Sequence, residues 1–386
     1  MSYVERLPSI QANLWSGKKP LLFNLDFELT ERCNNNCIHC CINQPAGDQI
    51  ALHKELTTDE LKRILREAAD LGALQVRFTG GEPLLRPDFE ELYLFARRLG
   101  LKVLLFTNGR LITPHLAQLF ARIPPLVPIE ITVYGMHSES YEAVSQAPGS
   151  FAQFWRGVSL LKEHKVPYVV KGALLPPNKG EIAELDAWAA QNPEMDTPPG
   201  YAMFFELRSH HDNPAKDCQI RALRVSPEEG LAVLTRHPES YRKEIVQFCQ
   251  SFLGQPGDRL FDCGVGKDGC VDASGSLLPC LGLRAPQLAY DLRSGSLREA
   301  LAEVFPHLRE LRAENPEYLN RCARCFLKSL CEQCPARSWN EHGTLDTPVE
   351  YLCQVAHAQA RWLGLIEENE HGWEGVNWLE RIQQDY

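Results

Sequence analysis

The sequence lacks the features that would place it in a membrane, outside the cell or on a nucleic acid. It has no run of Lys and Arg long enough to follow a phosphate backbone, and its net charge is −10, which argues against nucleic-acid binding. Residues 1–20 lack the basic-then-apolar order of a signal peptide. No stretch approaches the roughly eighteen unbroken apolar residues of a membrane span, and we find no internal repeat. We therefore expect a cytoplasmic protein that binds neither membranes nor nucleic acids.

The composition is otherwise that of a globular protein, with 386 residues, 44% hydrophobic and 23% charged, enough for one large domain or two medium ones. Its fourteen cysteines need an explanation, because a reducing cytoplasm does not favour disulfides and leaves metal ligation as the leading alternative. We interpret Cys41, Cys218 and Cys249 as small buried apolar side chains, although Cys41 adjoins a candidate ligand. The other eleven fall into three groups: Cys33, Cys37 and Cys40; Cys263, Cys270 and Cys280; and Cys322, Cys325, Cys331, Cys334 and Cys353.

Short apolar runs alternate with amphipathic stretches over the first half of the chain. The pattern predicts strands at 21–29, 74–78, 101–107, 129–134, 168–174 and 202–207, and helices at 58–71, 88–99, 113–121, 150–164 and 180–190. Thr58 or Asp59 is a plausible cap for the first helix. Six β/α repeats with short connections indicate a parallel α/β sheet. Eight would close a barrel, so we expect a partial (β/α)6 TIM-like barrel followed by a small cysteine-rich iron–sulfur domain.

Five regions follow from this reading. They are an N-terminal segment (1–20), the partial barrel (21–207), a polar helical connector (208–260), the cysteine-rich domain (261–355), and a C-terminal helix with an acidic tail (356–386). The cysteine-rich region has too little apolar periodicity for an ordinary core, so bound metal would have to supply stability. The tail, with Trp373 and Trp378, either contacts a partner or packs on the barrel.

The first cysteine group, Cys33, Cys37 and Cys40, directly follows the first predicted strand. Three thiolates can hold three irons of a [4Fe–4S] cube and leave the fourth iron open, and an open position is typical of catalytic metal sites. A zinc site is the alternative. It would need a fourth ligand, and His39, between two ligands, could not easily turn back to supply one.

This C-x3-C-x2-C pattern, with His39 before the third cysteine and a strand before the first, resembles the radical SAM superfamily. In that family S-adenosylmethionine chelates the open iron, an electron cleaves its sulfonium, and a 5′-deoxyadenosyl radical abstracts hydrogen from the substrate; the protein supplies binding and orientation. The sequence Thr79-Gly-Gly-Glu-Pro resembles the family's GGEP motif, in which the glycines allow close approach and the Glu takes the methionine amino group. The resemblance implies cofactor contacts by His39, Gly80, Gly81, Glu82, Pro83, Asn108, Thr132 and Lys171. An Asn-Gly turn at Asn108 and a solvated charge at Lys171 are the simpler alternatives for those two residues.

The C-terminal cysteines form the pattern Cys322-x2-Cys325-x5-Cys331-x2-Cys334-Pro335. Paired C-x2-C motifs suggest a zinc ribbon, but the short spacer and the Cys-Pro ending favour iron–sulfur. With Cys263, Gly275, Cys280 and Cys353, the order resembles the SPASM extension, which implies two auxiliary [4Fe–4S] clusters and three clusters in all. One cluster would use Cys263, Cys270, Cys280 and Cys334, and the other Cys322, Cys325, Cys331 and Cys353. The family has three residues where this chain has two between Cys331 and Cys334, which leaves the partition of ligands open.

Similar proteins mostly modify peptides, so the resemblance implies a peptide maturase that forms a cross-link or thioether, epimerises or otherwise oxidises its substrate. The first strand begins near residue 21, so we expect any leader peptide to be recognised by a separate protein, and an external electron donor is needed. Alternatives are a small-molecule dehydrogenase, a sulfatase-type Cys/Ser oxidase, or a metal-binding or electron-carrying protein without catalysis. No general acid or base is assigned. Five residues near strand ends or just after the barrel are interpreted as exposed loop residues: His137, Glu206, His210, His211 and Asp212.

Overall fold

The computed structural model describes residues 21–375, except 253–255, 262, 264, 267, 332 and 333. The predicted N-terminal segment, Trp378 and the side chain of Cys249 lie outside the described residues. Among the helices that are described, none combines the length and the apolar character that a membrane crossing requires.

Parallel strands form the centre of the N-terminal half, and neighbours in the sheet are neighbours in the chain. Each strand pairs in parallel with the next, and helices connect them, so the partial (β/α)6 barrel predicted from the sequence is confirmed. The first five strands lie within three residues of their predicted bounds. The strands are β1 (Asn24–Thr30), β4 (Gln75–Gly80), β5 (Lys102–Thr107), β6 (Ile129–Val133), β7 (Tyr168–Ala173) and β8 (Tyr201–Ala202).

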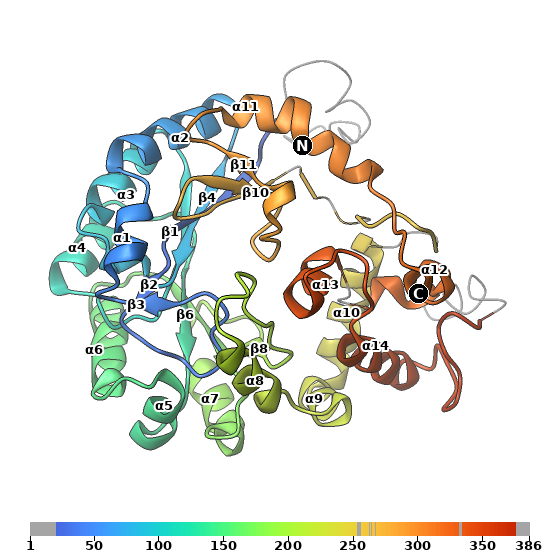
Figure 1. The fold of residues 1–386 in the computed structure, drawn as a ribbon. Helices are drawn as coiled ribbons and strands as arrows, with labels where there is room; N and C mark the ends of the chain where they lie inside the picture. The colour runs from blue at the N-terminus through green and yellow to red at the C-terminus, as the bar shows by residue number, and fades with distance from the viewer. Residues whose placement is uncertain are drawn as a thin grey trace, which may run out of the picture.

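Helices cover the outer face of this sheet (Figure 1). The first predicted one, α2 (Thr58–Asp70), buries Leu61, Ile64, Leu65 and Ala68, the spacing that predicted it. Its cap is Thr57, one residue before the predicted one, in a capping box with Glu60. Two short helices were not predicted, because α1 buries no residue and α5 is only two turns long. The helices of this half are α1 (Gln49–Lys54), α2, α3 (Phe89–Arg98), α4 (Pro114–Arg122), α5 (Ser138–Ser145), α6 (Ser150–Glu163) and α7 (Ile182–Ala189).

The prediction of a sixth strand over 202–207 is wrong beyond its first residue, because β8 ends at Ala202. Met203, Phe205 and Leu207 are nevertheless buried, so the alternation that suggested a strand is real. These side chains pack in two small apolar clusters instead of continuing the sheet. Residues 203–206 line a cavity described below.

The cysteine-rich region is continuous with the barrel sheet, which the sequence did not reveal. Its strand β9 (Cys270–Val271) pairs in parallel with β1, and β10 (Ser276–Leu278) and β11 (Tyr290–Asp291) follow antiparallel. The described sheet thus has nine strands. The predicted helical connector contains α8 (Pro214–Leu223), α9 (Pro227–Leu234) and α10 (Pro238–Phe252); beyond it lie α11 (Leu297–Glu299), α12 (Pro316–Asn320), α13 (Pro335–His342) and α14 (Glu350–Trp362).

Candidate active site and cysteine groups

The first cysteine group lies in a loop that leaves the end of β1. Two short strands, β2 (Arg32–Cys33) and β3 (Gln44–Pro45), pair in parallel and close the base of this loop. Backbone N–H groups of Asn36 and Ile38 donate to carbonyl oxygens at the end of α5 (2.8 and 3.0 Å). The Lys216 ammonium donates to the carbonyl oxygen of Cys37 (2.7 Å). The loop is therefore fixed by neighbouring backbone, although it has almost no regular structure of its own.

The thiols of Cys33, Cys37 and Cys40 line a cavity of about 480 Å³. It opens where β4, β5 and β6 end, the edge at which parallel α/β folds bind ligands. The structure therefore brings the cysteine loop and the GGEP-like turn to one cavity. Of the cofactor contacts predicted from the sequence, those on its wall are His39, Gly80, Gly81, Asn108 and Thr132.

The His39 ring packs against the rings of Phe205 and Tyr134, with centroids 4.8 and 5.7 Å apart. Burial, together with Lys216, lowers the pKa of His39 to about 4, so the ring is neutral near pH 7. Its Nδ1 atom is buried and has no hydrogen-bond partner. A neutral ring with an unused polar atom on the cavity wall suits contact with a heteroaromatic ligand.

Glu82 and Pro83 belong to the predicted motif but lie behind the cavity wall. Glu82 is fully buried, and its carboxylate accepts hydrogen bonds from Leu84 N (3.1 Å), Thr107 Oγ1 (2.8 Å) and Asn108 N (2.8 Å). Burial raises the pKa of Glu82 to about 7 despite these donors. In this arrangement Glu82 joins the turn after β4 to the end of β5, and it is not among the residues that line the cavity.

Lys171 also lies outside the cavity wall. It sits beside Thr132 in the sheet, but its ammonium pairs with Glu130 and lies 5.2 Å from the centre of the Phe106 ring. The side chain is 53% exposed. The structure therefore favours the simpler alternative, a solvated charge held by a neighbouring carboxylate.

Glu206 is the one residue of the five acid–base candidates that lines the cavity. Its Oε1 pairs with Arg337 (2.6 Å) and its Oε2 accepts from Asn340 Nδ2 (2.7 Å). Arg337 lines the cavity too, and the sequence analysis missed it. Arg337 lies on α13 three residues before Asn340, so the two side chains lie on one face of the helix. This i, i+3 spacing just after Cys334 was the signal in the sequence that could have identified Arg337.

The other four candidates face elsewhere. Asp212 pairs with Arg208 (2.6 Å), which holds the pKa of Asp212 at about 2. His137 pairs with Glu184 and His210 with Glu31, and the His211 ring packs on Trp339. Their reading as loop residues agrees with these positions.

Four C-terminal cysteines surround a second, small cavity of about 30 Å³. Its wall includes Cys322, Cys325, Cys331 and Cys353, together with His357 and Trp373, so the structure brings together the whole set predicted for one auxiliary cluster. Gly372 lies against this group, since a side chain there would come within 2.6 Å of Cys325 Sγ. Trp373 packs in the apolar cluster that contains Cys325 and Cys331, so it meets neither alternative for the tail, a partner or the barrel.

The other predicted set is only partly brought together. Burial, with smaller effects from the thiols of Cys334 and Cys263, raises the pKa of Cys280 to about 12. Cys270 lies in β9, fully buried between β1 and β10. Burial raises its pKa well above the ordinary value, with smaller effects from the charges of Glu28, Arg284, Asp26 and Asp272. These effects group Cys280 with Cys334 and Cys263, and the place of Cys270 in the set stays a prediction.

The donor sets suit iron–sulfur clusters. Burial raises the pKa of Cys33 above its ordinary value and that of Cys37 to about 12, so these thiols hold their protons until a cation replaces them, as iron does. The buried Asn35 Nδ2, on a residue that lines the first cavity, has no partner. In the described part of the chain, no three His, Cys, Asp or Glu side chains are grouped as ligands of a single metal ion.

Comparison with known proteins agrees with this geometry. Residues 27–189 match the family model described as "Radical SAM superfamily". An AdoMet-dependent heme synthase of Methanosarcina barkeri is 29% identical over 82% of this chain and 92% of its own length. A PqqA peptide cyclase of Xanthomonas axonopodis pv. citri is 25% identical over 80% and 79%. The crystal structure of Streptococcus suis SuiB with S-adenosylmethionine superposes with a TM-score of 0.61 at 17% identity, over 86% of this chain and 77% of SuiB.

The family model covers the barrel with its cysteine loop, and the likeness to SuiB extends through the cysteine-rich region. A fold of this kind implies S-adenosylmethionine and a [4Fe–4S] cluster as cofactors. Residues 27–189 thus form a radical SAM domain, most of the chain shares the fold of SuiB, and the protein is an enzyme of the radical SAM kind.

Proposed function

We propose that this enzyme oxidises a side chain of a peptide substrate after abstracting a hydrogen atom from it. The observation that carries the proposal is the shared cavity. Its walls hold the Cys33 loop on one side and, on the other, Arg337 of α13, the helix that begins directly after Cys334. A substrate in this cavity would lie between the first cysteine group and the second.

We assign the ligands as follows. Cys33, Cys37 and Cys40 hold the cluster to which S-adenosylmethionine binds, and this pair supplies a 5′-deoxyadenosyl radical when bound. Gly80 and Gly81 give the backbone room for the cofactor, and His39 presents its ring to it. Two auxiliary clusters are held by the sets Cys263, Cys280 and Cys334, and Cys322, Cys325, Cys331 and Cys353.

Oxidation of the substrate radical releases an electron, which an auxiliary cluster would accept when bound. It also releases a proton, so the cavity needs a proton acceptor. Glu206 is the only carboxylate among the residues that line it. The Arg337 guanidinium and the Asn340 amide hold that carboxylate in one orientation. We assign it the role of accepting the proton, with an external reductant serving the first cluster in the cytoplasm.

A peptide substrate is supported by the PqqA peptide cyclase among the relatives and by SuiB, which has also been crystallised with its precursor peptide SuiA. A tetrapyrrole side chain is the second candidate, because the heme synthase of M. barkeri matches over 92% of its length. Anaerobic incubation with S-adenosylmethionine, a reductant and each candidate substrate separates the two. A peptide that loses two hydrogens supports the first, and a modified tetrapyrrole with an unchanged peptide overturns it.

A further inference from the structure

Glu55 lies at the junction of α1 and α2, outside every motif of the sequence. It is the C-cap residue of α1, and its side chain is 7% exposed. A buried carboxylate is costly unless opposite charge and hydrogen bonds surround it. Its partners therefore indicate what this residue is for.

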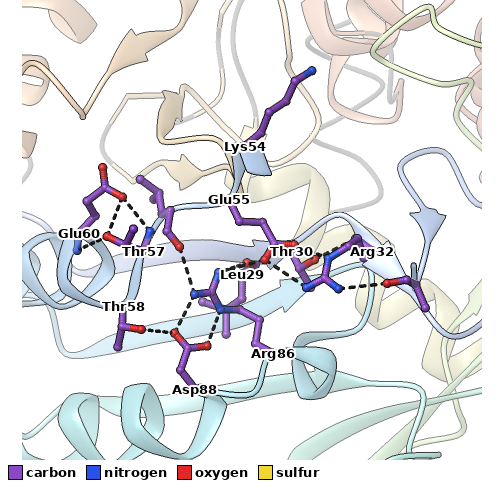
Figure 2. Close-up of polar contacts among 12 residues, drawn as sticks. Leu29, Thr30, Arg32, Lys54, Glu55, Thr57, Thr58, Glu60, Arg86 and Asp88 are labelled. Atoms are coloured by element: carbon purple, nitrogen blue, oxygen red, sulfur yellow. Dashed lines mark hydrogen bonds and ion pairs between the residues drawn. The ribbon is translucent and has the colours of Figure 1, made fainter. Parts of the chain in front are cut away.

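Three side chains converge on the Glu55 carboxylate (Figure 2). Oε1 accepts from the Thr30 hydroxyl and from Arg32 Nε (2.7 Å). Oε2 accepts from Arg32 Nη2 (3.2 Å) and from Arg86 Nη1 (3.4 Å). The contact with Arg32 is bidentate, the geometry in which a guanidinium and a carboxylate fix each other's orientation.

Arg32 directly precedes Cys33, so its position sets where the cysteine loop begins. Its carbonyl oxygen accepts from the backbone N–H of Glu82 (2.9 Å). A Cβ at Gly81 would lie 2.2 Å from that oxygen. The strand that enters the cysteine loop and the turn after β4 are therefore in direct backbone contact at Arg32.

Arg86 ties the far side of the same turn to the network. Its guanidinium donates to the carbonyl oxygens of Leu29 and Leu56 (both 3.1 Å) and pairs with Asp88 (2.7 and 2.8 Å). Thr58 at the start of α2 also donates to Asp88 (2.6 Å). Figure 2 shows both arginines pointing toward Glu55, one from each chain segment.

We propose that Glu55 is a positioning residue that sets the Cys33 loop against the Gly80–Gly81 turn, so that both meet the cofactor in register. The inference rests on the proposed role of Cys33 as a cluster ligand. Outer partners of this kind orient ligands without touching the metal.

The two arginines depend on Glu55 unequally. Without its carboxylate, Arg86 keeps Asp88 and two carbonyl oxygens. Among the described residues, the Arg32 guanidinium keeps only the carbonyl oxygen of Ala46 (3.0 Å). Loss of the charge therefore releases the cysteine loop more than the glycine turn.

The test compares Glu55→Gln with Asp88→Asn, each reconstituted without oxygen. Both remove one negative charge from the network, but Asp88 contacts Arg86 and not Arg32. For each variant we would measure iron per chain, the rate of iron loss to a chelator and Tm. We would also measure the KM for S-adenosylmethionine, kcat for 5′-deoxyadenosine formation, and the change in the electron paramagnetic resonance spectrum when S-adenosylmethionine is added. We expect Glu55→Gln to speed iron loss or raise that KM about 10-fold to 100-fold and to alter the resonance change, with Asp88→Asn within about twofold of wild type.

Equal effects of the two variants on iron loss, KM and resonance, with only Tm lowered, would show that Glu55 merely stabilises the fold. If Glu55→Gln does not fold, Arg32→Lys, which keeps the charge but not the bidentate contact, is expected to give the same changes, and wild-type behaviour in it would overturn the inference. The proposed ligands are judged apart from this, in wild type. If its resonance does not respond to S-adenosylmethionine, the proposed function fails, whatever the variants do.

Discussion

Replacing Cys270 should leave the iron content unchanged, although this cysteine stands among candidate ligands in the sequence. Three four-iron clusters would give about twelve irons per chain. Cys270 is fully buried in β9 between β1 and β10, so Cys270→Ala should cost stability through lost packing, about 1–2 kcal/mol. Cys280→Ala, in contrast, removes a thiol that neighbours Cys334 and Cys263, and iron should fall toward about eight.

The assay is anaerobic reconstitution followed by iron and sulfide counts, with thermal unfolding of the same samples. Wild type and Cys218→Ala serve as references. The interpretation of Cys218 as a buried side chain is wrong, because it is exposed on α8, far along the chain from every cysteine group. A loss of about four irons in Cys270→Ala would refute our grouping and restore the four-cysteine set predicted from the sequence. An unchanged count in Cys280→Ala would remove that group as a cluster site.

Three other changes test separate parts of the site. Glu206→Gln should leave 5′-deoxyadenosine formation intact and lower product formation at least about 100-fold; equal losses of both would contradict a role in proton transfer. Because burial raises the pKa of Glu82 from 4.5 to about 7, the wild type loses stability as the pH rises through that interval. We therefore expect the free energy of unfolding of metal-free Glu82→Gln, relative to that of the wild type, to rise by up to about 3 kcal/mol between about pH 5 and pH 8. A difference between the two proteins that does not change with pH would contradict this expectation. Gly372→Ala would bring a methyl within 2.6 Å of Cys325 Sγ; we expect about 1–3 kcal/mol of destabilisation and loss of iron, checked by melting and iron counts.

The barrel could be predicted because its signals are local. Buried strands and amphipathic helices repeat with their own periods, and α2 shows the expected apolar face at Leu61, Ile64, Leu65 and Ala68. The cysteine loop and the Gly80–Gly81 turn followed from spacing and resemblance. The strand predicted over 203–207 is wrong. Alternate side chains there are buried in two apolar clusters, but the backbone does not pair with a neighbouring strand.

Local sequence patterns could not predict contacts between segments that are distant in the chain. Glu55 meets residues 23 to 31 positions away, and Glu206 meets Arg337 across the connector. Lys171 shows how neighbours outside its own strand decide between two alternatives. Its place in the strand is as expected, but the carboxylate of Glu130 and the ring of Phe106 decide where its charge goes.

The pairing of β9 with β1 has a consequence for electron transfer between the proposed clusters. β1 leads into the Cys33 loop, and β9 leads through β10 to Cys280, so main-chain hydrogen bonds connect the two groups within one sheet. The ion pair of Glu28 in β1 with Arg284, four residues after Cys280, fastens the same junction, and both side chains are at most 3% exposed. The helical connector packs on another cysteine group, since Tyr241 and Ile245 of α10 share an apolar cluster with Cys325. The distance between the Cys33 loop and Cys280, on which electron transfer between the proposed clusters would depend, is therefore fixed at least in part by the sheet.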